Sequence, residues 1–256
     1  MRNLRLVLPK KKENERLLNE SFCLAENAGF MAFPREDLPS ISSLYDTQGA
    51  LNDFEMINYR PEDALTFLND NVAQIAVVGC DKFVEFKAAN PSAPVSERAS
   101  LPFGKCRLSF MAAVQDAPRL NTTSDLRRWA VEKGRSLICA TSYPSLVKAW
   151  AKENGLSDVV QPKSFKGGVE LSVPLGSADF AMDVVESGNT MRKCGLTEIF
   201  DPIMQSSAII VTRTDLPYAE ALKLNDMVGR LKNGAAPAET ETSTSGIIEQ
   251  RVAAFA

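Results

Sequence analysis

The sequence predicts an α/β protein, because short apolar runs alternate with segments that carry apolar residues at helical spacing. Leu4–Pro9 (LRLVLP) and Ile75–Gly79 (IAVVG) have the length and composition of buried strands. Residues 16–28 repeat leucine and phenylalanine as one face of a helix does. This alternation favours a parallel sheet over a sandwich. With 256 residues, 45% of them hydrophobic, the chain can form one large domain or two lobes.

The first part of the chain is expected to contain three strands and two helices. Gly29 is placed to end the first helix, and Pro61 suits the first turn of the second. In chain order these elements are strand Leu4–Pro9, helix Arg16–Ala28, strand Phe54–Tyr59, helix Glu62–Asn69 and strand Ile75–Gly79.

A second α/β lobe is expected after residues 86–101, which lose periodicity and gather proline, asparagine and serine, as a crossing or loop does. We expect lobe I at 1–100 plus 205–232, lobe II at 101–204 and a flexible tail at 233–256. The expected elements are strand Leu108–Val114, helix Thr123–Lys133, strand Leu137–Ala140, helix Leu146–Asn154, a helix after Gly167 and Gly168, strand Phe180–Val185, strand Ala208–Thr212 and helix Tyr218–Leu231.

Composition excludes several function classes. The net charge is -3 and both signs are interspersed, without the basic tract that nucleic acid requires. The five cysteines include no Cys-x-x-Cys pair, which favours core thiols in a reducing compartment over disulfides or a zinc site. The absence of histidine removes Ser–His and Cys–His nucleophile pairs and imidazole ligands. Any chemistry must rely on carboxylates, cations, backbone dipoles or a metal that arrives with the substrate.

The amino-terminal residues are charged from Arg2 onward, and no stretch has the apolar length of a signal peptide or a membrane span. We therefore expect a cytoplasmic protein that engages no membrane and no nucleic acid. The cationic run Lys10–Lys12 follows the first strand, where it is either a phosphate-facing surface or a solvated charge run.

A loop of small polar residues, 186–190, follows the apolar run Phe180–Val185. At the carboxyl end of a strand in an α/β protein, N–H groups and hydroxyls can converge on phosphate oxygens. Asp183 interrupts the apolar run, and a carboxylate there is costly to bury unless it is bonded or faces a polar site. A phosphate-binding loop is therefore one hypothesis, and a plain turn is the other.

Taken in order, the motifs of the chain resemble those of the ATP phosphoribosyltransferase family. The matches are spread over residues 4–212, and the long final segment is the most specific. They are LVLPK at 6–10, RL at 16–17, NYRPED at 58–63, IAVVGCD at 75–81, FGKCRL at 103–108, TSYPSL at 141–146 and GGVELSVPLGSADFAMDVVESGNTMRKCGL at 167–196.

The resemblance implies transfer of a phosphoribosyl group from phosphoribosyl pyrophosphate to N1 of ATP, with release of pyrophosphate, as the first step of histidine biosynthesis. It also implies two α/β lobes of the periplasmic-binding-protein type (type II), with the active site in the interlobe cleft. Mg²⁺ would be held mainly by substrate oxygens and water rather than by a dedicated protein cage, with Asp183 as a candidate ligand.

Position by position, the resemblance also implies roles for individual residues. Lys10, Arg16 and Glu170 are the expected catalytic residues. The expected ATP-binding residues are Arg60, Asp81, Thr141, Ser142 and Tyr143. The expected phosphoribosyl pyrophosphate-binding residues are Asp183, Glu186, Ser187, Gly188, Asn189 and Thr190.

The chain departs from the family pattern in two features. Lys11–Glu15 interrupt the family's usual Pro-Lys-Gly-Arg opening, and the residues after Thr212 are few for the regulatory domain of the long form. The chain therefore resembles the short form, which forms a hetero-oligomer with a regulatory subunit related to histidyl-tRNA synthetase. The alternative is a non-catalytic two-lobed protein that binds a small anion or serves as a regulatory paralogue.

Overall fold

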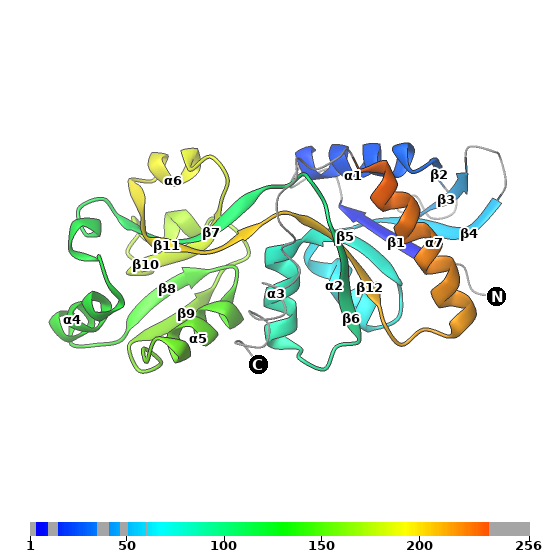
Figure 1. The fold of residues 1–256 in the computed structure, drawn as a ribbon. Coiled ribbons are helices and arrows are strands. Elements are labelled where there is room, and N and C mark those ends of the chain that lie inside the picture. The colour runs from blue at the N-terminus through cyan, green and yellow to red at the C-terminus, as the bar shows by residue number, and fades with distance from the viewer. Residues whose placement is uncertain (1–3, 10–14, 35–40, 47–50, 60, 236–256) are drawn as a thin grey trace. The chain divides into compact units, whose positions relative to one another are not determined.

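The computed structural model describes residues 4–9, 15–34, 41–46, 51–59 and 61–235. The chain folds as two compact units, each with its own β-sheet and helices (Figure 1). Unit 1 takes its described residues from Met1–Phe86, Ser92–Gly104 and Ser207–Glu249, and unit 2 takes them from Lys87–Pro91 and Lys105–Ser206. The expected α/β class is confirmed.

Among the described residues, a seven-stranded sheet forms the centre of unit 1. Its strands are β1 (Leu4–Pro9), β2 (Phe30–Pro34), β3 (Ile41–Asp46), β4 (Leu51–Tyr59), β5 (Ile75–Gly79), β6 (Val95–Ser100) and β12 (Ala208–Arg213). The order is β2-β3-β4-β1-β5-β12-β6. The three central strands β4, β1 and β5 are parallel, whereas the outer pairs are antiparallel. Pro9 pairs with Tyr59, so β1 and β4 end at the same edge.

Helices cover the sheet of unit 1. They are α1 (Glu15–Asn27), α2 (Pro61–Asn69), α3 (Cys80–Ala89), which begins in this unit, and α7 (Tyr218–Gly234). Side by side, α1 and α7 pack on one face (Figure 1). Their Leu24, Leu224 and Leu231 join Leu6 and Leu8 of β1 in one buried apolar cluster. Because side chains alternate along a strand, Val7 of β1 points to the opposite face of the sheet from Leu6 and Leu8. The helix α2 packs against β1 and β5.

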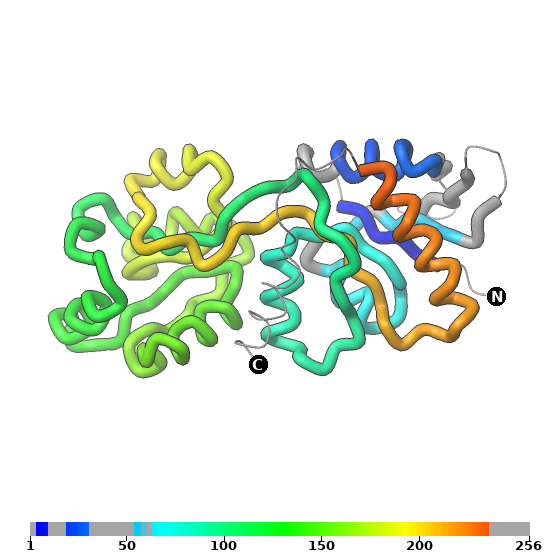
Figure 2. Tube along the Cα trace, viewed as in Figure 1, coloured from blue at the N-terminus to red at the C-terminus, as the bar shows by residue number. Residues whose placement is uncertain are grey.

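Unit 2 contains a mixed five-stranded sheet in the order β11-β7-β10-β8-β9. Its strands are β7 (Cys106–Ala113), β8 (Leu137–Thr141), β9 (Val160–Ser164), β10 (Phe180–Val185) and β11 (Leu196–Ser206). Strands β10, β8 and β9 are parallel, and β7 runs antiparallel to both β10 and β11. The main stretch of unit 2, Lys105–Ser206, begins between β6 and β7 and ends between β11 and β12 (Figure 2).

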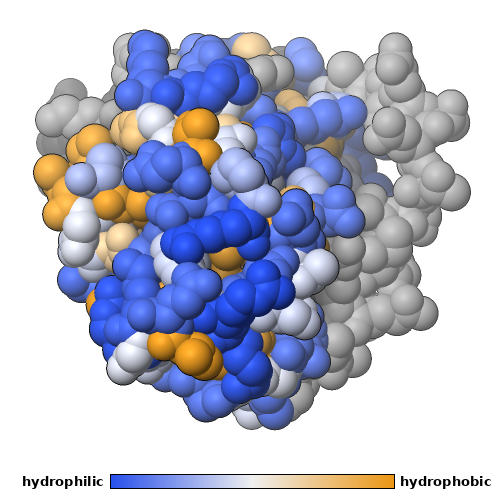
Figure 3. Space-filling model, turned by 90° about the vertical axis from the view of Figure 1, so that its left-hand side faces the viewer, coloured by the Kyte–Doolittle hydropathy of each residue, from blue (hydrophilic) through white to orange (hydrophobic). Residues whose placement is uncertain are grey.

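The two faces of the unit 2 sheet have different packing. Its helical segments are η1 (Ala117–Arg119), α4 (Thr123–Lys133), α5 (Pro144–Glu153), η2 (Val169–Ser172) and α6 (Asn189–Lys193). On one face, Trp150 of α5 lies 4.3 Å from Phe110 of β7, measured between ring centroids. On the other face, small side chains such as Ala140 and Ala181 pack against Val169 of η2 and Met191 of α6. The side of the molecule shown in Figure 3, which carries α4, is mostly hydrophilic with small separate apolar patches.

Several expected elements have the predicted bounds, namely β1, β5, α4 and β10. The helix expected after Gly167 and Gly168 is wrong, because only the short 3-10 segment η2 forms there. Pro174 has no N–H group for a helical hydrogen bond, and Gly176 adopts a left-handed conformation with a φ of 69°. A continuous helix is therefore interrupted before β10.

Other corrections concern strands and cysteines. The sheets are mixed rather than parallel, and the stretch 86–101 contains the end of α3 and the strand β6. Cys23 is exposed, so the expectation that all five cysteines lie in the core is wrong, although Cys80 and Cys139 are buried. Residues 236–256 of the expected tail and the basic run Lys10–Lys12 lie outside the described residues.

Candidate active site

The candidate phosphate loop lies at the carboxyl edge of the unit 2 sheet. Strands β8 and β10 are parallel neighbours, and Met182 pairs with Thr141. The segments at the carboxyl ends of these strands, Thr141–Tyr143 and 186–190, therefore leave the sheet at the same edge. This edge is where ligands bind in open parallel sheets.

The neighbouring strand β9 ends at the same edge. Ser164 pairs with Thr141, and the N–H of Phe165 donates to the carbonyl of Thr141 at 2.9 Å. The chain then passes through Gly168, which has a φ of 64°, into η2 with Glu170. Glu170 is half-buried. The structure thus brings three candidate segments, containing Thr141, Glu170 and Thr190, to one end of one sheet.

The three residues expected to bind ATP at the end of β8 differ in exposure. Thr141 and Tyr143 are buried, and the Thr141 hydroxyl accepts a hydrogen bond from the Tyr143 N–H at 2.8 Å. Ser142 between them is half-buried. The buried pair fixes the turn into α5, and Ser142 is the member of this segment with exposed surface.

Within the loop, Gly188 is buried, whereas Glu186, Ser187, Asn189 and Thr190 are exposed. Gly188 has a φ of 72°, in the left-handed region that favours glycine. The hydroxyl of Ser187 accepts a hydrogen bond from the Asn189 N–H at 3.3 Å. The loop therefore presents hydroxyl and amide groups on an exposed turn, which is the donor chemistry that phosphate oxygens require.

Asp183 lies on β10 opposite Ser109 of β7, and it is half-buried. Its carboxylate accepts a hydrogen bond from the N–H of Val184 at 2.9 Å. Because side chains alternate along a strand, Asp183 lies on the same face as Ala181 and Val185, which pack against η2 and α6. Asp183 and Glu170 therefore belong to the same side of the sheet.

Two arginines that the sequence analysis does not select as site residues bind the loop. The Arg107 Nη1 donates to the carbonyl of Glu186 at 3.1 Å, and its Nε donates to the Glu198 carboxylate at 2.8 Å. The hydrogen bond from Arg107 lowers the pKa of Glu198, against an opposing effect of partial burial. The Arg192 Nη2 donates to the carbonyl of Ser187 at 2.8 Å. Arg107 occurs in the FGKCRL motif, which is the signal that could have identified it.

Unit 1 has a comparable edge where β1, β4 and β5 end. Lys10 and Arg60 follow directly after β1 and β4 but lie outside the described residues. Arg16 lies in the first turn of α1, and its side chain is likewise not described. Asp81 follows β5 in the first turn of α3 and is 5% exposed.

No group of three or more histidine, cysteine, aspartate or glutamate residues able to hold a metal ion occurs among the described side chains. In the same part of the chain, every helix is too short or too polar to cross a membrane.

The two α/β units, each with parallel strands that end at one edge of its sheet, define the class of proteins with a periplasmic-binding-protein type of fold. A Candida albicans gene product with the generic periplasmic binding protein fold is similar over 91% of this chain and 71% of that chain, with a TM-score of 0.52 at 12% identity. An ATP phosphoribosyl transferase (HisG:HisZ) complex from Thermotoga maritima has a TM-score of 0.69 at 19% identity, over 90% of this chain and 98% of that chain. These likenesses show the fold.

Sequence comparison identifies the family. The family model described as "HisG: ATP phosphoribosyltransferase" matches residues 60–233. The ATP phosphoribosyltransferase of Rhodococcus erythropolis is 31% identical over 71% of this chain and 57% of that protein. That of Corynebacterium kroppenstedtii is 31% identical over 85% of this chain and 67% of that protein. The chain belongs to the ATP phosphoribosyltransferase family, and it spans little more than half the length of the Rhodococcus relative.

Proposed function

We propose that this protein is an ATP phosphoribosyltransferase that transfers phosphoribosyl from phosphoribosyl pyrophosphate to N1 of ATP and releases pyrophosphate. The observation that carries the proposal is the hydroxyl-and-amide loop 186–190, exposed except at Gly188, at the carboxyl edge of a sheet and within the residues that match the family. Such a loop suits a substrate with several phosphate oxygens. The proposed step opens histidine biosynthesis.

The proposed roles follow the groups that each segment offers. Ser187, Gly188, Asn189 and Thr190 would donate hydrogen bonds to phosphate oxygens of phosphoribosyl pyrophosphate. Glu170 and Asp183 would support the ribose hydroxyls or the positive charge of the sugar ring. Lys10 and Arg16 would neutralise the departing pyrophosphate, and Arg60, Asp81 and Ser142 are proposed to bind ATP.

This reaction suits a chain without histidine. Displacement at the anomeric carbon of ribose passes through a cation-like ring, and negative charge accumulates on the leaving pyrophosphate. Catalysis then depends on alignment of ATP N1 with that carbon and on stabilisation of charge rather than on a protein nucleophile. Carboxylates, cations and backbone amides supply these effects.

The donors at the loop fit a magnesium ion that is bound mostly by its substrate. Asp183 and Glu186 provide carboxylate oxygens there, and Mg²⁺ in phosphate chemistry keeps several waters and takes few protein ligands. The bound ion would neutralise part of the negative charge of the diphosphate. Asp183 is the proposed protein ligand because it lies on the same side of the sheet as η2 and α6.

We further propose that the protein works as the short form of the enzyme, in a hetero-oligomer with a regulatory subunit related to histidyl-tRNA synthetase. The Thermotoga maritima structure is of a HisG:HisZ complex, and its chain is covered to 98% by the similarity. An enzyme that draws on ATP and phosphoribosyl pyrophosphate would act in the cytoplasm.

The test is turnover by the purified chain with ATP, phosphoribosyl pyrophosphate and Mg²⁺, with and without the regulatory subunit. The adenine-ribosylated product is followed by its ultraviolet absorbance. Product that requires both substrates supports the proposal. Binding of phosphoribosyl pyrophosphate without product in either mixture would instead support a non-catalytic anion-binding paralogue.

A further inference from the structure

Arginine side chains bind two backbone carbonyl groups of the loop. Arg107 reaches from β7 to the carbonyl of Glu186, a contact between residues 79 positions apart in sequence. Arg192 of α6 binds the carbonyl of Ser187 and the side-chain oxygen of Asn189, each at 2.8 Å. Two consecutive peptide units therefore have their carbonyl oxygens held by guanidinium groups.

This arrangement sets the direction of two N–H groups. The carbonyl of Glu186 shares a trans peptide unit with the N–H of Ser187, and the carbonyl of Ser187 shares one with the N–H of Gly188. In a trans peptide unit the C=O and N–H bonds point in opposite directions. The arginines therefore turn both N–H groups away from themselves. Within the described part of the chain, neither N–H group has an acceptor.

Arg107 is itself oriented by Glu198 of β11. The Glu198 carboxylate binds both Nε and Nη2 of Arg107, which leaves Nη1 directed at the Glu186 carbonyl. Such a bidentate contact fixes the plane of the guanidinium group. The side chains of Arg107 and Glu198 are 29% and 27% exposed, and an ion pair with this bidentate geometry contributes to stability as well as to orientation.

We propose that Arg107, oriented by Glu198, and Arg192 are positioning residues for phosphate binding, because they hold the loop carbonyls and so direct the N–H groups of Ser187 and Gly188 toward phosphoribosyl pyrophosphate. This inference rests on the proposed function. Arg107 acts on the loop through the backbone carbonyl of Glu186, so its removal weakens binding of phosphoribosyl pyrophosphate and leaves binding of ATP unchanged.

The test compares Arg107→Met with Arg127→Met as a matched control. Arg127 of α4 also binds one carboxylate, that of Asp158, and one backbone carbonyl, that of Gly155, but it serves another loop of unit 2. Three quantities are measured for each protein with Mg²⁺ present: the Michaelis constant for each substrate, the melting temperature, and hydrogen exchange of the peptide that contains residues 186–190.

In Arg107→Met we expect the Michaelis constant for phosphoribosyl pyrophosphate to rise about tenfold or more, the scale of a lost charge-assisted hydrogen bond acting through the loop. Exchange in residues 186–190 should be faster, while the constant for ATP and the melting temperature follow the control. Arg107→Lys should recover part of the loss, because lysine retains the charge but not the planar fork. Arg192→Gln should show the same selective loss.

Equal effects of Arg107→Met and Arg127→Met would overturn the inference, and so would equal losses for both substrates. These outcomes leave the proposed function intact, because they require an active parent protein. Failure of the parent protein itself to bind phosphoribosyl pyrophosphate would remove the proposed function and this inference together.

Discussion

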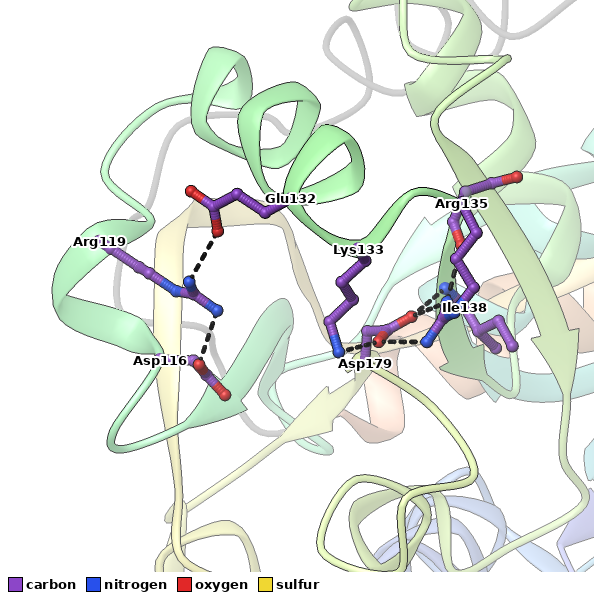
Figure 4. Close-up of polar contacts among 8 residues, drawn as sticks. Asp116, Arg119, Glu132, Lys133, Arg135, Ile138 and Asp179 are labelled. Atoms are coloured by element: carbon purple, nitrogen blue, oxygen red, sulfur yellow. Dashed lines mark hydrogen bonds and ion pairs between the residues drawn. The ribbon is translucent and has the colours of Figure 1, made fainter.

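Arg135 holds the carboxylate of Asp179 with two hydrogen bonds, from Nη1 to Oδ2 at 2.7 Å and from Nη2 to Oδ1 at 2.9 Å (Figure 4). The Nζ atom of Lys133 lies 2.9 Å from Oδ1 of Asp179, and the N–H of Ile138 donates to Oδ2 at 2.7 Å. The Asp179 side chain is 3% exposed. Since Asp179 directly precedes β10, this contact joins the end of α4 and the start of β8 to the strand that leads into the loop.

We predict that Asp179→Asn destabilises unit 2 by roughly 1.5–3 kcal/mol, because it removes the charge from buried hydrogen bonds. Both tryptophans of the chain, Trp129 and Trp150, lie in unit 2. Denaturant unfolding followed by tryptophan fluorescence therefore reports on this unit. Asp226→Asn, on an exposed position of α7, is the control. An equal stability of Asp179→Asn and the parent protein would contradict the prediction.

The same carboxylate predicts a pH dependence of stability. Burial alone would raise the pKa of Asp179, but the hydrogen bonds from Arg135, Ile138 and Lys133 outweigh it, and the net shift is downward. A group with a lowered folded pKa stabilises the fold above its unfolded pKa, about 3.9 for aspartate, and this stabilisation is lost as the pH falls through the folded pKa. The stability difference between the parent protein and Asp179→Asn should therefore be constant well above the unfolded pKa and shrink as the pH falls below it. A stability difference that does not change as the pH falls below the unfolded pKa would count against the ionic contact.

Gly234→Ala should destabilise unit 1. A Cβ atom at Gly234 would lie 2.7 Å from the N atom of Ala28 and 2.9 Å from the carbonyl oxygen of Leu24, so α7 would have to move away from α1. We expect a loss of about 1–3 kcal/mol, typical of overpacking. Gly229→Ala in the same helix is the control, since its Cβ would meet nothing within 4 Å and helix propensity favours alanine. Thermal unfolding by circular dichroism measures both, and equal melting temperatures would refute the close approach.

The core strands could be predicted from the sequence because burial on both faces produces continuous apolar runs, as in Leu4–Pro9 and Ile75–Gly79. Strands β6 (VSERAS) and β9 (VQPKS) could not, because they are half exposed and polar and therefore lack that signal. Their place in the sheets depends on partners far along the chain.

Gly188→Ala should weaken binding of phosphoribosyl pyrophosphate. The φ of 72° is unfavourable for alanine, and a Cβ atom would lie 2.9 Å from Nη1 of Arg192, which would displace that side chain from the Ser187 carbonyl. Gly134→Ala is the matched control, because Gly134 has a φ of 62° but an added Cβ meets nothing within 4 Å. The Michaelis constant for phosphoribosyl pyrophosphate should rise only for Gly188→Ala; a rise in both variants, or in neither, would argue against the Arg192 contact.

Thr190→Ala should raise the Michaelis constant for phosphoribosyl pyrophosphate by about tenfold or more, because it removes one hydroxyl donor to a phosphate oxygen. Steady-state kinetics at saturating ATP measures the change. Thr214→Ala, an exposed threonine of unit 1, provides the comparison. Unchanged kinetics in Thr190→Ala would remove this hydroxyl from the binding site.

The location of the candidate loop could be predicted from residue types, because glycine and small polar residues directly after an apolar run indicate a loop at the end of a buried strand. Arg107 and Glu198 could not be assigned in this way. They lie on the neighbouring strands β7 and β11, and the sequence does not show how these two strands are aligned with each other. The alignment also shifts within β11, between Ile199 and Met204. Thr141 and Tyr143 are expected to bind ATP because they belong to a family motif, but both side chains are buried. A motif contains buried residues as well as exposed ones, and the sequence does not distinguish them.

The central claim is that residues 186–190 bind the phosphate of phosphoribosyl pyrophosphate. A crystal structure of the protein with phosphoribosyl pyrophosphate and Mg²⁺ tests it most directly. We predict phosphate oxygens within about 3 Å of the Ser187 and Gly188 nitrogen atoms and the Thr190 hydroxyl. Phosphoribosyl pyrophosphate bound elsewhere, with this loop unoccupied, would contradict the account.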